Sequence, residues 1–395
     1  MSKEYKIGDE IEVTVEKIVP RGPGIAFVEN LTVLTPLSGP GDVLRIRLTE
    51  VKKRLAFAEI VEIIKPGTGR TAPACEYFGT CGGCDFQQMS YGEQLGSKVG
   101  IVRDCLHRIG KIEFDDEIKI IGSPRPLAYR SRAAWHVDRE KQAIGYFRRD
   151  SHEVIDVKTC PILTPELSAK LTNLRESMAW DNLWEDVAKI DAASGDDGKV
   201  SVYSRSMAEA TEDLSHSVGG ESYAFSAETF FQANKFLIGE LIETAIGDLS
   251  GGSAFDLYCG VGLFSVPMAR RFENVTAVED NSAAIRFAKK NIRAARLSNI
   301  RLVNMGVGRF LGENQKKGLD LVVIDPPRSG TEKRTIPAVA ALRPAKISYV
   351  SCEPSILARD LRLFIDAGYK IETITALDLF PQTHHVETVV RLARI

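Results

Sequence analysis

The stretch Ala254-Phe-Asp-Leu-Tyr-Cys-Gly-Val-Gly262 decides the fold of the larger part of this 395-residue chain. Its apolar segment, 254–258, predicts a buried strand, and the closely spaced glycines predict a tight turn into a helix over 262–271. Glycines at such a turn let the backbone approach a bound nucleotide closely. The stretch therefore predicts the first unit of a nucleotide-binding α/β sheet.

The sequence after this stretch keeps alternating between short buried strands and helices. Strands that alternate with helices imply a doubly wound, mostly parallel sheet, so we expect a Rossmann-like α/β domain from about residue 226 onward. The last apolar strand, 386–392, is expected to be antiparallel at the sheet's edge. The other expected strands are 254–258, 275–279, 300–304, 320–324 and 347–351, and the expected helices are 230–246, 262–271 and 282–296.

Polar residues at the ends of these strands predict a cofactor site. Glu279 ends the second strand, nineteen residues after Gly260, which suits a carboxylate that accepts hydrogen bonds from ribose hydroxyls. The third glycine of a dinucleotide fingerprint is missing, so S-adenosylmethionine is favoured over NAD. Asn304 and Asp325 close later strands at the same edge and are expected to reach the adenosine and the amino-acid end. A tight strand–helix turn without a ligand is the structural alternative.

Cys352 and Glu387 are the candidate catalytic pair. Cys352 follows the apolar run 347–351 and precedes Glu353-Pro354, so its thiol leaves the sheet at the edge where open α/β sheets place their chemistry. A thiol is mostly protonated near pH 7, so a positive neighbour such as Arg328 must assist it. Glu387 heads a buried strand, and desolvation should raise its pKa toward the range of a base that works near neutrality.

The composition is that of a globular protein with two or three domains, with 44% hydrophobic residues, 26% charged residues and a net charge of −2. This charge excludes an overall polybasic nucleic-acid binder but allows a local basic patch. Residues 125–149 contain seven Lys/Arg and two acids. The interleaved Tyr129, Trp135, Tyr146 and Phe147 favour nucleic acid over a solvated charged surface. No run approaches the length of a membrane span and the N-terminus does not resemble a signal peptide, so we expect a cytoplasmic protein.

The residues before 226 predict smaller units. Short alternating apolar runs separated by Gly-Pro turns are typical of a small β-barrel. Ser90, with Glu93 three residues later, predicts a capped helix with one apolar face. The expected segments are a barrel over 5–64, a linker over 65–73, a helix over 90–110, and a mixed α+β segment over 118–224 with a polar loop at 191–198.

Four cysteines form a candidate metal site. Cys75, Cys81, Cys84 and Cys160 supply four thiolates, a number that suits tetrahedral zinc or an iron–sulfur cluster equally well. A redox pair of Cys81 and Cys84 is a further alternative. The additional Cys75 and the absence of a thioredoxin-like pattern weaken that alternative, and the spacing alone does not choose between the two metals.

In combination these motifs resemble the RNA 5-methyluridine methyltransferases, the family that methylates C5 of specific uridines in tRNA and 23S rRNA. The resemblance covers nearly the whole chain, and the β-rich N-terminus resembles the TRAM barrel, an RNA-binding module. The motifs that carry the resemblance are Phe230-Phe-Gln-Ala-Asn234, Asp256-Leu-Tyr-Cys-Gly-Val-Gly262, Asp325-Pro-Pro-Arg-Ser-Gly330, Ser351-Cys-Glu-Pro354 and His385-Val-Glu-Thr388.

The resemblance implies a class I S-adenosylmethionine methyltransferase domain that works by covalent catalysis. Cys352 would add to C6 of the target uracil and make C5 nucleophilic toward the methyl donor. Glu387 would then remove the C5 proton, and elimination would release Cys352. The residues implied to contact the methyl donor are Gln232, Tyr258, Glu279, Asp325 and, as a looser match, Asn304.

The resemblance also favours a [4Fe-4S] cluster over zinc at Cys75, Cys81, Cys84 and Cys160, with a structural or RNA-orienting role. RNA is the expected partner, 23S rRNA ahead of tRNA, and a monomer is the expected state. A noncatalytic iron–sulfur RNA-binding protein would predict loss of the catalytic pair, which is present. The expected domains are a TRAM-like barrel over 1–65, a central iron–sulfur and RNA-binding domain over 66–92 and 118–225, and a methyltransferase domain over 93–117 and 226–395.

Overall fold

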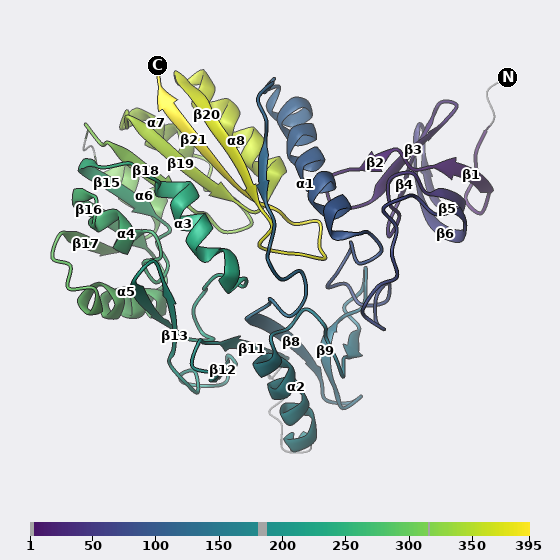
Figure 1. The fold of residues 1–395 in the computed structure, drawn as a ribbon, viewed down its shortest axis with the longest axis horizontal. Coiled ribbons are helices and arrows are strands. Elements are labelled where there is room, and N and C mark those ends of the chain that lie inside the picture. The colour runs from purple at the N-terminus through teal and green to yellow at the C-terminus, as the bar shows by residue number, and fades with distance from the viewer. Residues whose placement is uncertain (1–3, 181–187, 315–316) are drawn as a thin grey trace.

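The computed structural model describes residues 4–180, 188–314 and 317–395, which form a large sheet and two smaller sheet-containing bodies (Figure 1). The strands of the large sheet are β7 (Lys119–Ile121), β15 (Gly251–Leu257), β16 (Phe272–Glu279), β17 (Ile300–Asn304), β18 (Leu321–Ile324), β19 (Lys346–Ser351), β20 (Tyr369–Leu377) and β21 (Glu387–Arg394). Their order is β17-β16-β15-β18-β19-β21-β20-β7. The first five strands in this order are parallel, which confirms the predicted Rossmann-like α/β fold.

Helices cover both faces of this sheet, as a doubly wound fold requires. One face packs against α1 (Tyr91–Cys105), α6 (Val307–Glu313), α7 (Thr335–Ala341) and α8 (Pro354–Asp366). The other face packs against α3 (Ile238–Ile246), α4 (Ser265–Ala269) and α5 (Ser282–Ala294). Because α1 comes from the first third of the chain and packs on α8, the large body draws on distant parts of the sequence (Figure 1).

The position of the last strand was predicted incorrectly. The sequence pattern predicted an antiparallel strand at the sheet's edge, whereas β21 is antiparallel but lies inside the sheet, between β19 and β20. Most of its residues are buried, which suits a strand covered on both faces. β7 forms the edge and pairs parallel with β20, so residues 119–121, assigned from the sequence to the central segment, belong to the large sheet.

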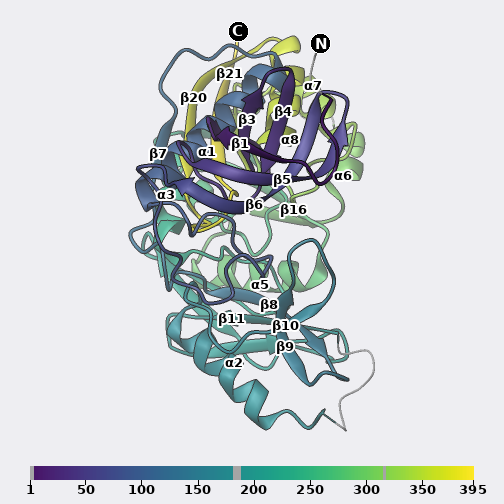
Figure 2. The same ribbon diagram turned by 90° about the vertical axis from the view of Figure 1, so that its right-hand side faces the viewer.

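The N-terminal body is a curved six-stranded sheet around its own hydrophobic core (Figure 2). Its order is β1-β5-β6-β4-β3-β2, so β1 and β2 are its two edges and, among the described residues, no hydrogen-bonded ladder closes it into a complete barrel. The strands are β1 (Glu10–Thr14), β2 (Lys17–Ile18), β3 (Gly24–Val28), β4 (Leu31–Thr35), β5 (Val43–Lys52) and β6 (Leu55–Lys65).

The central body is a five-stranded antiparallel sheet packed on α2 (Pro165–Ser177). The predicted polar loop at 191–198 is shorter than expected, because Ala192 and Ala193 are buried and extend a strand through Ser194. The strands, in sheet order, are β10 (Val154–Asp156), β9 (Ala143–Phe147), β8 (Arg132–Asp138), β11 (Lys189–Ser194) and β12 (Val200–Tyr203), and a separate hairpin contains β13 (Leu214–Val218) and β14 (Glu221–Phe225).

Two predicted helices differ in extent. The helix predicted over 230–246 begins only with the short turn η3 (Lys235–Leu237) and α3, because the preceding segment is bound elsewhere: the Arg132 guanidinium donates to the carbonyl oxygens of Ala227 and Thr229. The helix predicted over 90–110 has the expected Ser90 cap and continues past α1 as a π-helical turn, η1 (Leu106–Gly110). None of the helices in the described part of the chain is long and apolar enough to cross a membrane.

Candidate active site

The predicted site residues lie at one edge of the large sheet. Leu257 pairs with Ile324, and Ile324 pairs with Tyr349, so the carboxyl ends of β15, β18 and β19 meet. β16 and β17 end at the same edge, where Glu279 pairs with Asn304. The strand ends therefore bring together residues that are far apart in sequence, namely Tyr258, Glu279, Asn304, Asp325 and Cys352.

The antiparallel direction of β21 places Glu387 at this edge too. Ser351 pairs with Thr388, so the next position on each chain puts Cys352 opposite Glu387. Glu387 is 5% exposed, and Cys352 is partly exposed as a free cysteine. The sequence-predicted thiol and carboxylate are thus neighbours on adjacent strands.

The electrostatic surroundings of Cys352 keep its thiol protonated in the absence of a ligand. Burial, followed by the repulsion of the Glu387 carboxylate, raises the pKa of Cys352 to about 12. The positive charge of the neighbouring Arg328 guanidinium lowers this pKa. Arg328 also lies 5.8 Å from the ring centroid of Phe380. Arg328 is therefore the positive neighbour that the sequence predicted Cys352 to need.

Two carboxyl groups, Glu387 and Asp325, lie near the thiol, and a third, Asp256, lies next to Asp325. Burial raises the pKa of Glu387 well above its ordinary value, with Asp325 as the next cause and Arg328 opposing both. Burial and the neighbouring Asp256 also raise the pKa of Asp325. Burial raises the pKa of Asp256 to about 7, although the Ser265 hydroxyl donates a hydrogen bond to its carboxylate. A cationic ligand at this edge would favour ionisation of these groups.

The glycine turn and Glu279 form the cofactor side of the edge. Gly260 and Gly262 have φ angles of 54° and 92°, a left-handed conformation that glycine adopts without strain. The Gly260 N–H donates to Oε2 of Glu279 at 3.0 Å, and the Asn281 N–H donates to Oε1 at 2.8 Å. Glu279 is thus held against the glycine turn in the position predicted for a ribose ligand.

Asn304 supports this arrangement through the backbone. Its Nδ2 donates to the carbonyl oxygens of Glu279 and Asp280, both at 3.1 Å, so its amide group is used within the protein. Gln232 differs, because its side chain is 4% exposed and has no hydrogen-bond partner among the described residues. The Tyr258 hydroxyl donates to Oε2 of Glu332 at 2.6 Å. Among these side chains, only Gln232 has an amide that no protein group already uses.

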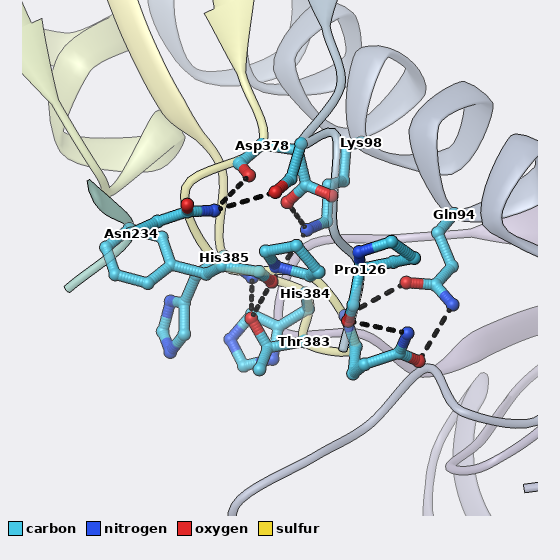
Figure 3. Close-up of polar contacts among 12 residues, drawn as sticks. Gln94, Lys98, Pro126, Asn234, Asp378, Thr383, His384 and His385 are labelled. Carbon is cyan, nitrogen blue, oxygen red and sulfur yellow. Dashed lines mark hydrogen bonds and ion pairs between the residues drawn. The ribbon is translucent and has the colours of Figure 1, made fainter. Parts of the chain in front are cut away.

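A buried ion pair holds the loop 378–386, which joins β20 to β21 and leads into Glu387. Lys98 on α1 pairs with the Asp378 carboxylate, and its Nζ also donates to the Phe380 carbonyl at 2.9 Å (Figure 3). The Lys98 and Asp378 side chains are both 0% exposed. The Asn234 amide donates to the Asp378 carbonyl at 3.5 Å, which connects the Gln232 segment to the same loop (Figure 3).

A second set of contacts holds the middle of this loop. The Gln382 N–H donates to Oε1 of Gln94 at 3.0 Å, and the Gln94 amide donates back to Oε1 of Gln382 at 3.0 Å. Gln382 Nε2 reaches the Pro126 carbonyl at 3.2 Å (Figure 3). Sequence reasoning missed this network. Its only signals were Lys98 on a largely apolar helix and Asp378 between two leucines.

The four predicted metal-ligand cysteines line one cavity of about 200 Å³, together with Arg328 and His385. All four are free thiols, and burial is the main cause that raises the pKa of each of them. Their mutual repulsion adds to this effect, while Arg130 opposes it for three of them. Within the described residues, no three His, Cys, Asp or Glu are arranged to hold a single metal ion. Four thiols that line one cavity are the donor set that zinc or an iron–sulfur cluster would need.

The basic region 125–149 only partly faces solvent. Trp135 and Tyr129 are 0% exposed core residues, and Arg132 is bound to backbone carbonyls, so these three cannot contact RNA directly. Two of the four aromatic residues that favoured nucleic acid in the sequence, Trp135 and Tyr129, therefore belong to the core. Phe147, by contrast, lines a second cavity at the protein surface.

Comparisons with known proteins agree with this geometry. The family model for tRNA (uracil-5-)-methyltransferases matches residues 207–395, and the model for the TRAM domain matches residues 4–61. An uncharacterized RNA methyltransferase of Clostridium tetani is 30% identical over 94% of this chain and 93% of its own length. A 23S rRNA (uracil(1939)-C(5))-methyltransferase of Pectobacterium atrosepticum is 28% identical over 96% of this chain and 92% of its own.

A solved structure shares the fold over almost the whole chain. The tRNA (uracil-54, C5)-methyltransferase of Pyrococcus abyssi, in complex with S-adenosyl-L-homocysteine, superposes with a TM-score of 0.74 at 24% identity. The match covers 97% of this chain and 100% of that one. The arrangement of all three bodies is therefore a known one.

Proposed function

The chain belongs to the RNA uracil-C5 methyltransferase family, and on this premise we propose that it methylates C5 of a uridine in 23S rRNA through a covalent bond between Cys352 and C6 of the base. The methyl donor is S-adenosylmethionine, and the N-terminal body is a TRAM domain. The observation that carries the proposal is the position of Cys352 opposite Glu387 on paired strands, at the edge where the glycine turn lies.

In the proposed reaction, the Cys352 thiol first loses its proton to solvent. Sγ of the thiolate then adds to C6, and the electrons of the 5,6 double bond move toward C5 and O4. C5 then takes the methyl group, and the donor leaves as S-adenosylhomocysteine. The Glu387 carboxylate removes the C5 proton, after which the C5–H electrons restore the double bond and expel the Cys352 thiolate. The raised pKa of Glu387 suits it to accept a proton near neutral pH.

We assign the methyl donor to the sheet edge between the glycine turn and Asp325. Glu279 would accept hydrogen bonds from the ribose, and Gln232 would use its unpaired amide. Asp325, whose pKa burial raises, would face the positively charged end of the donor. Tyr258 would lie beside the donor at this edge, and Asn304 would act through the turn that it supports.

We propose that the cysteine cavity holds a [4Fe-4S] cluster with a structural or RNA-orienting role. Cys75, Cys81, Cys84 and Cys160 would bind it as thiolates, and the Gly83 N–H, which lies 3.4 Å from Sγ of Cys81, would stabilise a charged sulfur. Zinc is the lesser alternative. Purified protein that is brown and contains about four iron and four sulfide per chain would support the cluster, whereas one zinc ion and no visible absorbance would contradict it.

The RNA identity rests on the Pectobacterium atrosepticum relative, and tRNA is the alternative because of the family model and the Pyrococcus abyssi structure. We propose that the protein is cytoplasmic, because both candidate RNAs are cytoplasmic. We also propose that it is a monomer. We also propose the domain division 1–65, 66–92 with 118–225, and 93–117 with 226–395, with β7 added to the last of these.

The covalent step is tested with RNA that contains 5-fluorouridine, because fluorine at C5 cannot be removed as a proton and the adduct is trapped. In the presence of S-adenosylmethionine we expect a complex that survives denaturing electrophoresis for the wild type and not for Cys352→Ala. Offering 23S rRNA fragments and tRNA separately identifies the substrate. A wild-type protein that binds these RNAs but forms no adduct with any of them would favour the noncatalytic iron–sulfur alternative.

A further inference from the structure

A second cavity, of about 430 Å³, lies where the three bodies meet, and we call it the junction cavity. It is bounded by the turn between β2 and β3, the cysteine segment, the β9 end of the central sheet, and the loop 378–386. Its lining residues are Arg21, Gly82, Gly83, Asp85, His136, Tyr146, Phe147, Arg148, Arg149, Asp150 and His384. The turn between β2 and β3, which we call the TRAM turn, packs tightly here. A Cβ added at Gly22 would lie 3.0 Å from Cβ of His384.

One side of the junction cavity is cationic. Arg21 has a left-handed backbone (φ 73°) and, within the described residues, no hydrogen-bond or ion-pair partner. Arg148 donates only through Nε, to Glu153 at 2.7 Å, so its terminal nitrogens have no protein partner in the described part of the chain. Arg149 bonds to Asp85 at 3.2 Å, and its buried Nε has no partner.

Carboxylates balance the charge of these arginines but do not use all of their guanidinium nitrogens. Asp85 is occupied on both sides, because it accepts hydrogen bonds from Arg149 and from Nδ1 of His384 at 2.6 Å. Asp150 is the second carboxylate in the lining. Glu153, which pairs with Arg148, is a third carboxylate beside the three arginines, so what this wall offers to phosphate oxygens is the unpaired guanidinium nitrogens of Arg21 and Arg148.

The other side of the cavity is flat and aromatic. The rings of His136 and Phe147 are stacked, with centroids 3.6 Å apart and planes 18° from parallel. Burial, followed by the repulsion of Lys189, lowers the pKa of His136, so its ring is neutral at physiological pH. A neutral stacked pair of rings beside arginines with unpaired guanidinium nitrogens can bind a nucleobase and its phosphate together.

The junction cavity also adjoins the proposed active site. Gly82, Gly83 and Tyr146 line both this cavity and the cysteine cavity, and the cysteine cavity is also lined by Arg328, whose charge lowers the pKa of Cys352. His384 and His385 line one cavity each, with ring centroids 4.2 Å apart. A nucleotide in the junction cavity would therefore lie one cavity away from the reactive thiol.

We propose that the junction cavity binds one nucleotide of the substrate RNA that flanks the target uridine. Its base stacks on the His136–Phe147 pair, and its phosphate contacts Arg21 and Arg148. This inference rests on the proposed function, which it deepens by assigning a site for recognition of single-stranded RNA next to the target. Because the site combines the TRAM turn, the central sheet and the loop 378–386, it forms only when the three bodies are assembled.

The test measures RNA affinity without a methyl donor by fluorescence anisotropy. Phe147→Leu should weaken binding about tenfold through loss of stacking. Arg21→Gln should reduce the slope of log Kd against log salt by about 0.7, the value for one phosphate contact on a single strand. Arg301→Gln, an exposed arginine on the distant strand β17, is the matched control and should change neither quantity. Single-turnover methylation at saturating RNA should stay at the wild-type rate in Arg301→Gln.

An abasic substitution identifies the nucleotide. At one flanking position it should weaken binding to the wild type and leave binding to Phe147→Leu unchanged, because the stacking partner is already missing. The inference would be overturned if, at every position near the target, the abasic substitution and Phe147→Leu weakened RNA binding additively. An unchanged salt slope for Arg21→Gln would overturn it too. Arg21→Gln keeps the test valid if Phe147→Leu does not fold, since Arg21 is exposed. A wild type that binds no RNA would overturn the proposed function and this inference together, whereas variants that bind like the wild type would overturn only the inference.

Discussion

At the scale of single residues, Cys352 and Glu387 divide the proposed chemistry between a nucleophile and a base. The same burial that raises the pKa of Cys352 to about 12 also raises that of Glu387, so in the absence of ligands neither group favours its charged form. Arg328 and the positively charged methyl donor would both favour the charged forms. The pair is therefore expected to become active only when the substrates are bound.

Replacing Glu387 with glutamine should stop the reaction after methyl transfer. An amide cannot accept the C5 proton, so turnover should fall by about 10² to 10⁴-fold, and methylated RNA should remain bound to Cys352. Denaturing electrophoresis with RNA methylated from labelled S-adenosylmethionine measures this complex. Glu372→Gln, a surface carboxylate on β20, should behave like the wild type. Free methylated RNA released at the normal rate from Glu387→Gln would exclude Glu387 as the base.

Asp256 should make stability depend on pH. Burial raises its pKa from 3.8 to about 7, so between these pH values the folded protein holds a proton that the unfolded chain releases. The free energy of unfolding should therefore fall as the pH rises from about 4 to 7, with a contribution on the order of a few kcal/mol from this residue. Urea unfolding of the wild type and Asp256→Asn across this range measures the difference. Parallel pH profiles for the two proteins would contradict the assignment.

At the scale of secondary-structure elements, the strand β21, which carries the proposed base, depends on a helix from the first third of the chain. α1 carries Gln94 and Lys98, and both bind the loop 378–386 that leads into Glu387. The loop has no regular structure of its own, so these side chains determine its path. α1 thus connects the segment that carries the cysteines to the segment that carries the base.

Lys98→Met should be strongly destabilising because it leaves the Asp378 carboxylate buried without its cation. A loss of about 3–5 kcal/mol in the free energy of unfolding is expected. Lys17→Met is the matched control, since Lys17 pairs with Asp104 on the same helix α1 but is 44% exposed, and should cost at most about 1 kcal/mol. Chemical denaturation measures both values. The double variant Lys98→Met/Asp378→Leu should recover part of the loss, and equal losses in Lys98→Met and Lys17→Met would show that the buried pair is unimportant.

At the scale of the whole molecule, the cysteine segment links the central body to the loop 378–386. The backbone N–H groups of Asp85 and Phe86 both donate to the Gln382 carbonyl at 3.0 Å, directly after Cys84. Ordering of the cysteines by a bound group should therefore stabilise the loop 378–386. The proposed cluster would act on catalysis through this loop, without transferring electrons.

Cys84→Ser should remove the visible absorbance of the proposed cluster and lower the melting temperature by about 5 °C, because the adjoining hydrogen bonds become less ordered. RNA affinity should fall with it. The dissociation constant for S-adenosylmethionine, measured by calorimetry, should stay within about twofold of the wild-type value, because no residue proposed to contact the methyl donor lies in the cysteine segment. Cys105→Ala, a buried cysteine outside the cavity, should keep the absorbance. An unchanged spectrum in Cys84→Ser would rule out this residue as a ligand.

Local sequence determined much of this protein. The apolar run into Gly260 and Gly262, the acid at the end of β16 and the thiol before Pro354 are consequences of backbone preference and periodicity, which act within a few residues. For this reason the parallel strands and the edge that carries the site could be predicted. The extents of α3 and of the loop at 191–198 were less predictable, because Arg132 and buried alanines override local preference there.

Only the tertiary structure decided where β21 and β7 lie, that Lys98 is buried against Asp378, and that the TRAM turn, the central sheet and the loop 378–386 enclose the junction cavity. These features join residues that are tens to hundreds of positions apart, and their energies come from desolvation and strand pairing across that separation. A sequence pattern records which side chains are present and how they alternate. Which of them lose contact with water, and beside which charges, depends on how the distant segments pack.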